Sequence, residues 1–331
     1  MKDVAVSLVD DSLIFTTEGQ SAPLVLPAYV AVQTGTERVL AYGDEAKSML
    51  GREPKSISVI RVLEEGIVAD HNGASALFRI GLKQVLGKFI LVRPRVIIAC
   101  RSGNLGKMSV KNMAISGGAR EVFLIEMGMA TAIGMNLDVQ KPEIKAILSV
   151  SDDWFEFAII SLAGVLAGVN GAIGTKSFVE DIQNHVSLLR EFRPEPAAIE
   201  SQLSSGGLQA SAAINIPGWE VWAGRSEQGR RTTQSITIED LTIGMMPSLI
   251  RMTERIKDGI RSLTAEKQSQ LGGVTIYATG SAMRIPGLSQ VIASQLGLAM
   301  AFYPSAVHPS IDGCQRVLKE LNVLRRVMPK P

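Results

Sequence analysis

Residues 4–15 decide the fold, and they read Val4-Ala5-Val6-Ser7-Leu8-Val9-Asp10-Asp11-Ser12-Leu13-Ile14-Phe15. Apolar residues recur at every second position of the first half, which is the period of a strand. An acidic pair then separates this run from a second apolar run, so the stretch predicts a β-hairpin that turns at Asp10-Asp11. The same pattern returns at residues 144–161 around Asp152-Asp153. Two halves that each begin with strand, turn and strand suggest an internal duplication.

Strand-like and helix-like patterns alternate along the rest of the chain. Short apolar runs predict strands at residues 94–100, 121–125, 144–150, 156–161, 164–168 and 274–278. Helical periodicity and helix boundary signals predict helices at residues 43–50, 70–86, 108–116, 129–135, 177–192 and 238–263. This alternation favours an α/β protein.

The composition of the 331 residues excludes several classes of protein. Apolar residues make up 46% of the chain, which is ample for a large core. The 34 basic residues nearly balance the 32 acidic ones, and the net charge of +2 argues against a nucleic-acid partner, because phosphate affinity needs clustered cations. Two Cys and three His exclude a disulfide framework, and we expect no metal site.

The apolar segments do not predict a membrane span. The longest run, residues 157–169, covers about 13 positions, whereas about 20 are needed to cross a bilayer. The first residues show no basic segment followed by a long apolar one, so we expect no signal peptide. We therefore expect a cytoplasmic protein.

A family pattern is carried by five stretches of the first half. They are Tyr42-Gly43-Asp44-Glu45-Ala46-Lys47-Ser48-Met49-Leu50-Gly51-Arg52, Arg61-Val62-Leu63-Glu64-Glu65-Gly66-Ile67-Val68-Ala69-Asp70, Arg93-Pro94-Arg95-Val96-Ile97-Ile98, Gly118-Ala119-Arg120-Glu121-Val122-Phe123-Leu124-Ile125-Glu126 and Ala130-Thr131-Ala132-Ile133-Gly134. The chain resembles the bacterial actin homologue MreB, a rod-shape filament protein, and its relative MamK. The similarity is specific over residues 38–140 and thinner beyond them.

The resemblance implies the actin-like fold of the actin, Hsp70 and sugar-kinase superfamily. That fold is an α/β architecture with two lobes, each built on a five-stranded mixed sheet flanked by helices, and a nucleotide cleft between them. It places lobe I at residues 1–147, with a small subdomain at about 31–65. Lobe II spans residues 148–310, with a small subdomain at about 181–244, and residues 311–331 return to lobe I.

Proteins of this fold hold ATP between two strand–turn–strand loops, and both loops depart from the family pattern here. The first has Ser7 in place of the metal-side Asp, and the second has Ser149 in that place. Acidic residues stand in both turns, and Gly280 alone remains of a glycine triplet on the adenine side. The cleft remnants, which we do not expect to bind ATP, are Ser7, Asp10, Asp11, Ser149, Asp152, Asp153, Gly280 and Ser281.

The charges in the two turns oppose a triphosphate. A phosphate charge about 5 Å from a carboxylate is repelled by roughly 3 kcal/mol at an effective dielectric constant of ~20. Two other interpretations of the acids stay open: they are ordinary solvated turn residues, or they bind a divalent cation. Residues 101–111 contain no acid, so we expect no general base there and no catalytic residue.

A candidate for membrane contact is Phe89-Ile90-Leu91, which lies between Lys88 and Arg93. Apolar side chains between cations suit an anionic lipid surface, and the equivalent loop of MreB-like proteins can insert in the membrane. The alternative is that residues 89–92 simply begin the buried strand that follows.

These observations lead to one main hypothesis and two alternatives. We expect an MreB-like cytoskeletal scaffold without ATP binding or ATPase activity, whose partner is itself or an MreB-type filament, with the inner face of the cell membrane as a further candidate. No cofactor is expected. The first alternative is an active filament-forming ATPase with a rebuilt site, which would need ATP and Mg²⁺. The second is a monomeric actin-like adaptor for a membrane-associated machine.

Overall fold

The structure is a computed structural model that describes residues 3–36, 38–87, 92–103, 106–208, 214–221, 228–305 and 307–319. The chain divides into two compact units. Unit 1 comprises residues 1–147, 158–168 and 305–331, and unit 2 comprises residues 148–157 and 169–304. The boundary passes through strands β11, β12 and β13, so these strands contribute to both units.

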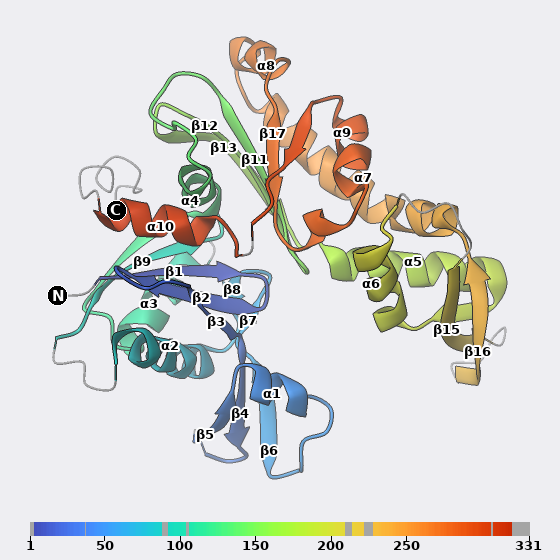
Figure 1. Cartoon of the computed structure of the whole chain (residues 1–331), viewed down its shortest axis with the longest axis horizontal. Helices are drawn as coiled ribbons and strands as arrows, with labels where there is room; N and C mark the ends of the chain where they lie inside the picture. The colour runs from blue at the N-terminus through green and yellow to red at the C-terminus, as the bar shows by residue number, and fades with distance from the viewer. Residues whose placement is uncertain are drawn as a thin grey trace. The chain divides into compact units, whose positions relative to one another are not determined.

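Two five-stranded sheets with the same wiring form the framework (Figure 1). The first runs β3-β2-β1-β9-β10 and the second runs β13-β12-β11-β17-β18. The strands of the first are β1 (Val4–Val9), β2 (Ser12–Thr17), β3 (Leu24–Pro27), β9 (Arg95–Cys100) and β10 (Glu121–Glu126). Those of the second are β11 (Lys145–Val150), β12 (Phe155–Ser161), β13 (Gly164–Gly171), β17 (Ile276–Thr279) and β18 (Met300–Phe302). The shared order agrees with the internal duplication that the sequence suggests.

The first sheet is mixed, because β1 pairs antiparallel with β2 and parallel with β9. The residues of β1 alternate between its two faces. Val4, Val6 and Leu8 enter a core with apolar residues of α2 and α3. The other face carries Ser7, which contacts α4 and α10. The helices are α2 (His71–Leu86), α3 (Lys107–Ser116), α4 (Met127–Gly134) and α10 (Ser310–Lys319).

A small sheet with the order β5-β4-β6 extends from unit 1. A short helix covers one of its faces. The residues packed between them form a buried cluster: Tyr29, Ala31, Ala41 and Ala46. Two short strands then lead into α2, which begins after the N-cap Asp70 and ends at Leu86, where the predicted helix 70–86 also ends. The elements are β4 (Tyr29–Gln33), β5 (Val39–Tyr42), α1 (Asp44–Met49), β6 (Ile57–Arg61), β7 (Leu63–Glu64) and β8 (Ile67–Val68).

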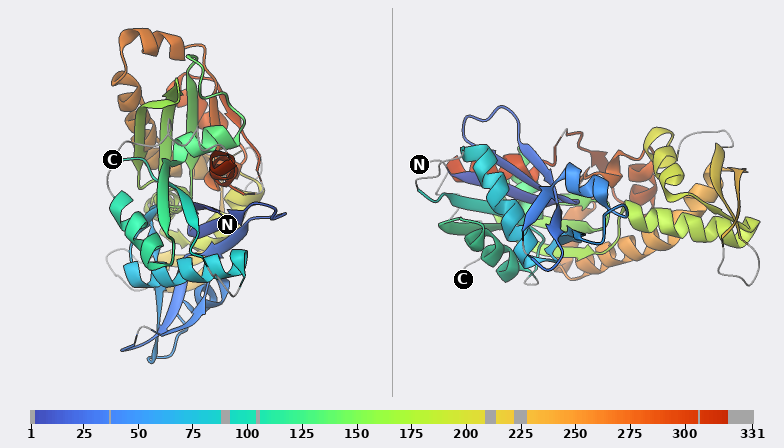
Figure 2. Two further views of the ribbon diagram at one scale, coloured as in Figure 1. Left: turned by 90° about the vertical axis from the view of Figure 1, so that its left-hand side faces the viewer. Right: turned by 90° about the horizontal axis from the view of Figure 1, so that it is seen from below.

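Unit 2 carries a long helix pair, α5 and α7, which lie side by side (Figures 1 and 2). Helix α7 begins with a capping box between Thr237 and Asp240. Helix α5 ends two residues before the predicted boundary, because Glu191 turns to φ 50° and Phe192 starts a strand. The elements are α5 (Thr175–Arg190), β14 (Phe192–Pro194), α6 (Pro196–Ser205), β15 (Ile214–Val221), β16 (Gln228–Ile236), α7 (Ile238–Arg261), α8 (Ala265–Leu271), the 3-10 helix η1 (Ala282–Arg284) and α9 (Leu288–Leu296).

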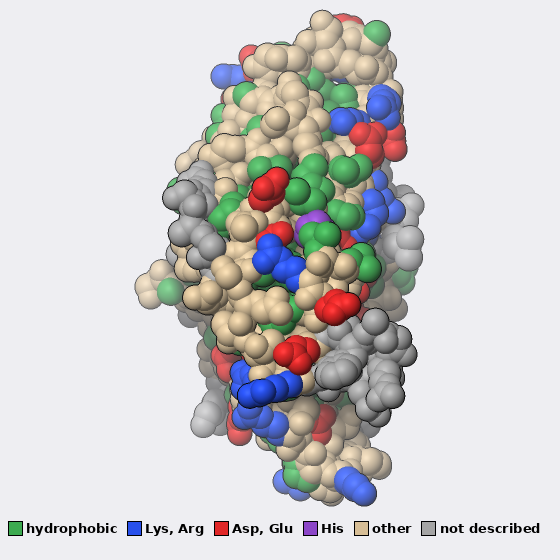
Figure 3. Space-filling model, turned by 90° about the vertical axis from the view of Figure 1, so that its right-hand side faces the viewer, with side chains coloured by type: hydrophobic (Ala, Val, Ile, Leu, Met, Phe, Trp, Pro, Cys, Tyr) green, Lys and Arg blue, Asp and Glu red, His purple; other side chains and the backbone are tan. Residues whose placement is uncertain are grey.

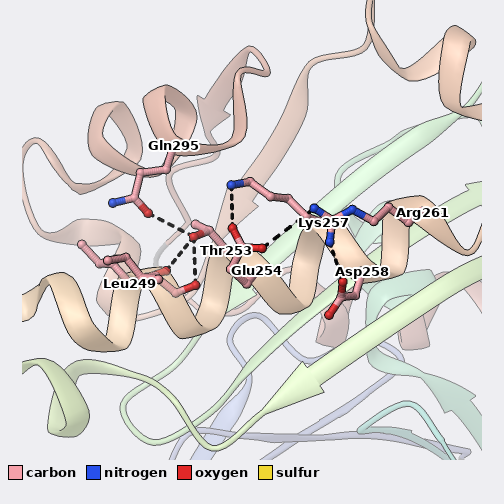
Figure 4. Close-up of polar contacts among 8 residues, drawn as sticks. Leu249, Thr253, Glu254, Lys257, Asp258, Arg261 and Gln295 are labelled. Carbon is pink, nitrogen blue, oxygen red and sulfur yellow. Dashed lines mark hydrogen bonds and ion pairs between the residues drawn. The ribbon is translucent and has the colours of Figure 1, made fainter.

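Charges of both signs are interspersed on the molecular surface, as Figure 3 shows for one face. On the exposed side of α7 they pair within the helix (Figure 4). Lys257 Nζ lies 2.8 Å from Glu254 Oε1, and Arg261 lies 2.7 Å from Asp258 Oδ1. Exposed pairs of this kind contribute little stability, but they leave no unbalanced basic stripe on this helix.

Candidate functional site

The first loop is a two-residue turn between β1 and β2, where Val9 pairs with Ser12. Asp10 takes a positive φ of 53°, which short polar side chains tolerate. Asp11 is only 8% exposed and forms an ion pair with Arg61 of β6. The Tyr29 hydroxyl donates a hydrogen bond of 3.1 Å to the same carboxylate. The solvated-turn interpretation is therefore wrong for Asp11, whose charge is matched inside unit 1.

Ser7 lies beneath this loop in a buried polar chain that the sequence did not predict. Its Oγ lies 2.6 Å from Ser310 Oγ and 3.8 Å from Met127 Sδ. His308 Nδ1 lies 2.9 Å from the same Ser310 hydroxyl. Burial lowers the pKa of His308 to about 3, so the imidazole is neutral at pH 7. All four side chains in this buried cluster are therefore uncharged: Ser7, Met127, Ser310 and His308.

Close packing of α4 against α10 holds Ser310 in place. A Cβ atom on Gly134 would overlap the Pro309 carbonyl oxygen, and one on Gly313 would overlap the Ala130 carbonyl oxygen. Two glycines thus let the helix backbones meet directly. The sequence offers no local signal for these contacts, because α4 and α10 lie far apart along the chain.

The second loop folds onto the first turn of α5 within unit 2. The Thr175 and Lys176 backbone N–H groups donate to the carbonyl oxygens of Ser151 and Asp152, at 3.3 and 2.8 Å. Lys176 Nζ also lies 3.7 Å from Asp153 Oδ2, and the Asp153 side chain is only 9% exposed. Helix N-termini attract negative charge, and this one already faces the chain's own carbonyl groups and an acid.

Large side chains and Ser281 complete the second loop. Trp154 and Phe155 follow the acids and are buried, at 1% and 0% exposure. Ser281 Oγ donates a hydrogen bond of 2.8 Å to Asp152 Oδ1. Gly280 has a φ of 104° and its Cα lies against the backbone of Val150. The structure therefore brings Asp152, Gly280 and Ser281 together. Ser149 of β11 is also buried, at 3% exposure.

The segment after β9 contains no acid, yet a carboxylate reaches it from a neighbouring strand. Glu126, at the end of β10, accepts a hydrogen bond of 3.1 Å from Lys107 Nζ. Its other oxygen lies 3.5 Å from Ser102 Oγ. A search of residues 101–111 alone misses this acid, because β10 brings it in from outside that segment.

The remaining sequence-based candidates gain no support from the structure. Among the described residues, no group of three or more His, Cys, Asp or Glu side chains could hold a metal ion, so the divalent-cation interpretation of the turns is not supported. Phe89, Ile90 and Leu91 lie outside the described residues. In the part of the chain that the structure describes, no helix is both long and apolar enough to cross a bilayer.

Comparison with known proteins identifies the family of this chain. The family described as MreB/Mbl protein matches residues 1–326 of the chain. The chain belongs to the MreB/Mbl family. This MreB/Mbl chain is 27% identical, over 306 residues, to the cell shape-determining protein MreB of Haemophilus influenzae. The match covers 89% of this chain and 87% of that protein.

Two solved structures show how far the MreB/Mbl fold extends. MreB5 of Spiroplasma citri bound to AMPPNP superposes with a TM-score of 0.83 at 18% identity, covering 97% of both chains. A MamK double helical filament gives a TM-score of 0.74 at 16% identity, covering 96% of this chain and 99% of that one. Two predictions are therefore confirmed: the chain is an MreB/MamK-like actin homologue, and it has the actin-like fold.

Proposed function

We propose that this MreB/Mbl-family chain is a cytoskeletal scaffold that assembles with itself or with an MreB-type filament, and that it neither binds nor hydrolyses ATP. Its family membership supports the filament half of the proposal, since relatives are named cell shape-determining proteins and MamK forms a double helical filament. The loss of nucleotide chemistry rests on the two loops.

The observation that carries the loss of ATP binding is the second loop. Phosphate groups bind where backbone N–H groups and small residues leave room for them. Here the first turn of α5 donates to the loop's own carbonyl oxygens, and Lys176 faces Asp153. A phosphate would have to displace these contacts and then lie beside two carboxylates.

The first loop supports the same conclusion for the metal. Mg²⁺ prefers carboxylate, carbonyl and water oxygens. Ser7 stands where the resemblance places the metal-side Asp, and its hydroxyl is engaged with Ser310 rather than pointing to an open site. One of the two acids of the turn, Asp11, is already paired with Arg61.

A calorimetric titration of the purified full chain with Mg-ATP tests the proposal. We expect no binding heat at millimolar nucleotide and no phosphate release above background. The Haemophilus influenzae MreB relative serves as a comparison protein in the same buffer. Micromolar affinity would contradict the proposal, and phosphate release that is lost in Asp153→Asn or Glu126→Gln would favour the rebuilt ATPase.

Electron microscopy of the concentrated protein tests the scaffold half separately. We expect filaments, or decoration of an MreB-type filament, whose abundance is the same with and without Mg-ATP. Persistent monomers that decorate nothing would favour the adaptor. A flotation assay with anionic vesicles, comparing the natural chain with Phe89→Asp, tests membrane association: we expect co-flotation that this substitution reduces.

A further inference from the structure

A pocket of about 440 Å³ lies in unit 1, between the small sheet and the first turns of α2. None of its lining residues belongs to either strand–turn–strand loop. Its apolar side is formed by Val32 of β4, Val39 of β5 and Ile60 of β6. Its volume falls within the range of small-ligand sites.

The pocket exists because the two faces of the small sheet are covered differently. Helix α1 covers the face that carries Tyr29 and Ala31. On the opposite face, α2 approaches the sheet at Gly73, where a Cβ would overlap Val30 and Val62. It approaches again at Gln84, whose Nε2 donates a hydrogen bond of 3.1 Å to the Tyr42 hydroxyl of β5. The pocket lies along residues 70–79 of α2 and its N-cap, and it leaves the aliphatic side chains of Val32, Val39 and Ile60 open to a ligand.

Five polar side chains of α2 and its N-cap line the pocket: Asp70, His71, Asn72, Ser75 and Arg79. Ser75 is only 6% exposed, and among the described residues its hydroxyl has no hydrogen-bond partner. Asp70 accepts one hydrogen bond, of 2.6 Å, from the Gly73 N–H, and no described cation pairs with it. Arg79 donates to the Ser116 carbonyl oxygen at 2.8 Å, and no carboxylate in the described part of the chain pairs with it.

The order of these groups defines the ligand. Asp70 and Arg79 are nine residues apart, which is about 13 Å along a helix axis at 1.5 Å per residue. Ser75 lies between them. The pocket lining therefore combines a carboxylate, a hydroxyl and a guanidinium, which belong to the N-cap and to different turns of α2, with an aliphatic surface. An extended tetrapeptide spans about 13 Å between its termini.

We propose that this pocket binds a short, zwitterionic peptide of three or four small apolar residues. The peptide ammonium pairs with Asp70, its carboxylate pairs with Arg79, and rotation about χ1 lets the Ser75 hydroxyl bond a central amide. The small side chains contact Val32, Val39 and Ile60. This binding is independent of the proposed function, because it uses none of the residues of the two loops.

Two simpler occupants fit less well. A lone anion at the N-terminus of α2 would meet the Asp70 carboxylate, which already caps that end of the helix. A purely apolar molecule would leave the Ser75 hydroxyl unsatisfied and would desolvate two charges without pairing them. A ligand with both charges at its ends avoids both costs.

The test is a titration of the full chain with trialanine and tetra-alanine, followed by methyl NMR of Val32, Val39 and Ile60. We expect saturable shifts, with affinity reduced about tenfold in Asp70→Asn and in Arg79→Gln. Asn is also a good N-cap, so Asp70→Asn removes the charge and keeps α2 intact. Circular dichroism checks the fold of each variant.

Capped peptides make the assignment of the two ends specific. N-acetylation should weaken binding to the natural chain about tenfold and leave binding to Asp70→Asn unchanged, and C-terminal amidation should behave likewise with Arg79→Gln. The absence of methyl shifts at about 10 mM peptide overturns the proposal. Shifts that are equal in both variants and with capped peptides also overturn it.

Discussion

Ser7 and Ser310 are 303 positions apart, and their hydroxyl oxygens lie 2.6 Å from each other in the buried side of unit 1. Their surroundings, Met127 and His308, are uncharged at neutral pH. A position that the resemblance assigns to a metal-side carboxylate has become part of the neutral packing between β1 and α10. The energetics of this site follow from that change.

Restoring the carboxylate should damage the fold. Ser7→Asp would bury a negative charge beside neutral groups, and we expect it to lower the free energy of unfolding by about 3–5 kcal/mol. Ser7→Ala removes only a hydrogen bond and should cost about 1 kcal/mol. Urea unfolding followed by circular dichroism measures both. If Ser7→Asp is as stable as Ser7→Ala, then the surroundings of Ser7 accommodate a charge and the neutral-site argument fails.

His308 should make unit 1 sensitive to acid. Burial lowers its pKa from 6.5 to about 3, so between these values the unfolded chain binds a proton that the folded chain does not. The free energy of unfolding therefore falls as the pH drops from about 6.5 towards 3, by up to about 1.4 kcal/mol per pH unit. The variant His308→Asn keeps an acceptor for the Ser310 N–H and cannot titrate. Urea midpoints at several pH values should fall less steeply for this variant, and parallel curves would contradict the assignment.

Gly313 should be intolerant of any side chain. Its added Cβ would overlap the Ala130 carbonyl oxygen, so Gly313→Ala must push α10 away from α4. We expect a loss of at least about 2 kcal/mol. Gly273→Ala is the matched control, since nothing lies within 4 Å of its Cβ and its φ is not in the left-handed region. That variant should be neutral or slightly stabilising. Equal thermal midpoints for both variants would refute the close approach of the helices.

Arg61 should stabilise the first turn through Asp11. Arg61→Met leaves the Asp11 carboxylate buried with the Tyr29 hydroxyl but without its cation, and we expect a loss of about 2 kcal/mol. The double variant Asp11→Asn with Arg61→Met should recover part of that loss, because no buried charge remains. Denaturant unfolding of the single and double variants gives the coupling. A double variant that is less stable than Arg61→Met alone would argue against an unpaired charge.

Local patterns in the sequence predicted many elements of the fold, but they missed others, among them α6, α9, α10, β15 and β16. The alternation in residues 4–15 predicted the first hairpin, and the helical periodicity of residues 70–86 predicted α2 within one residue. Both signals arise from contacts between residues close in sequence, which a single chain displays directly. The family resemblance then supplied the two lobes, each with a five-stranded mixed sheet.

The site was predictable only in part, because its neighbours come from distant segments. The sequence identified Ser7, Asp11 and Asp152 as altered positions, but it did not reveal that Ser310 or Arg61 contacts them. Ser310 and Arg61 have ordinary local contexts, and only the tertiary fold brings them to the loops. The solvated-turn interpretation of Asp11 fails for the same reason, because its partner Arg61 comes from a distant strand.

The contact between α4 and α10 has a consequence for folding during synthesis of the chain. Helix α4 ends at Gly134 and α10 begins at Ser310, about 175 residues later. A ribosome that adds roughly 5–20 residues per second needs about 10–35 s to cover that interval. During this time the face of β1 that carries Ser7 has been synthesised, but the helix that will bury it has not. Synthesis of unit 1 therefore starts before that of unit 2 and finishes after it. All residues of unit 2 are synthesised before α10, which completes unit 1.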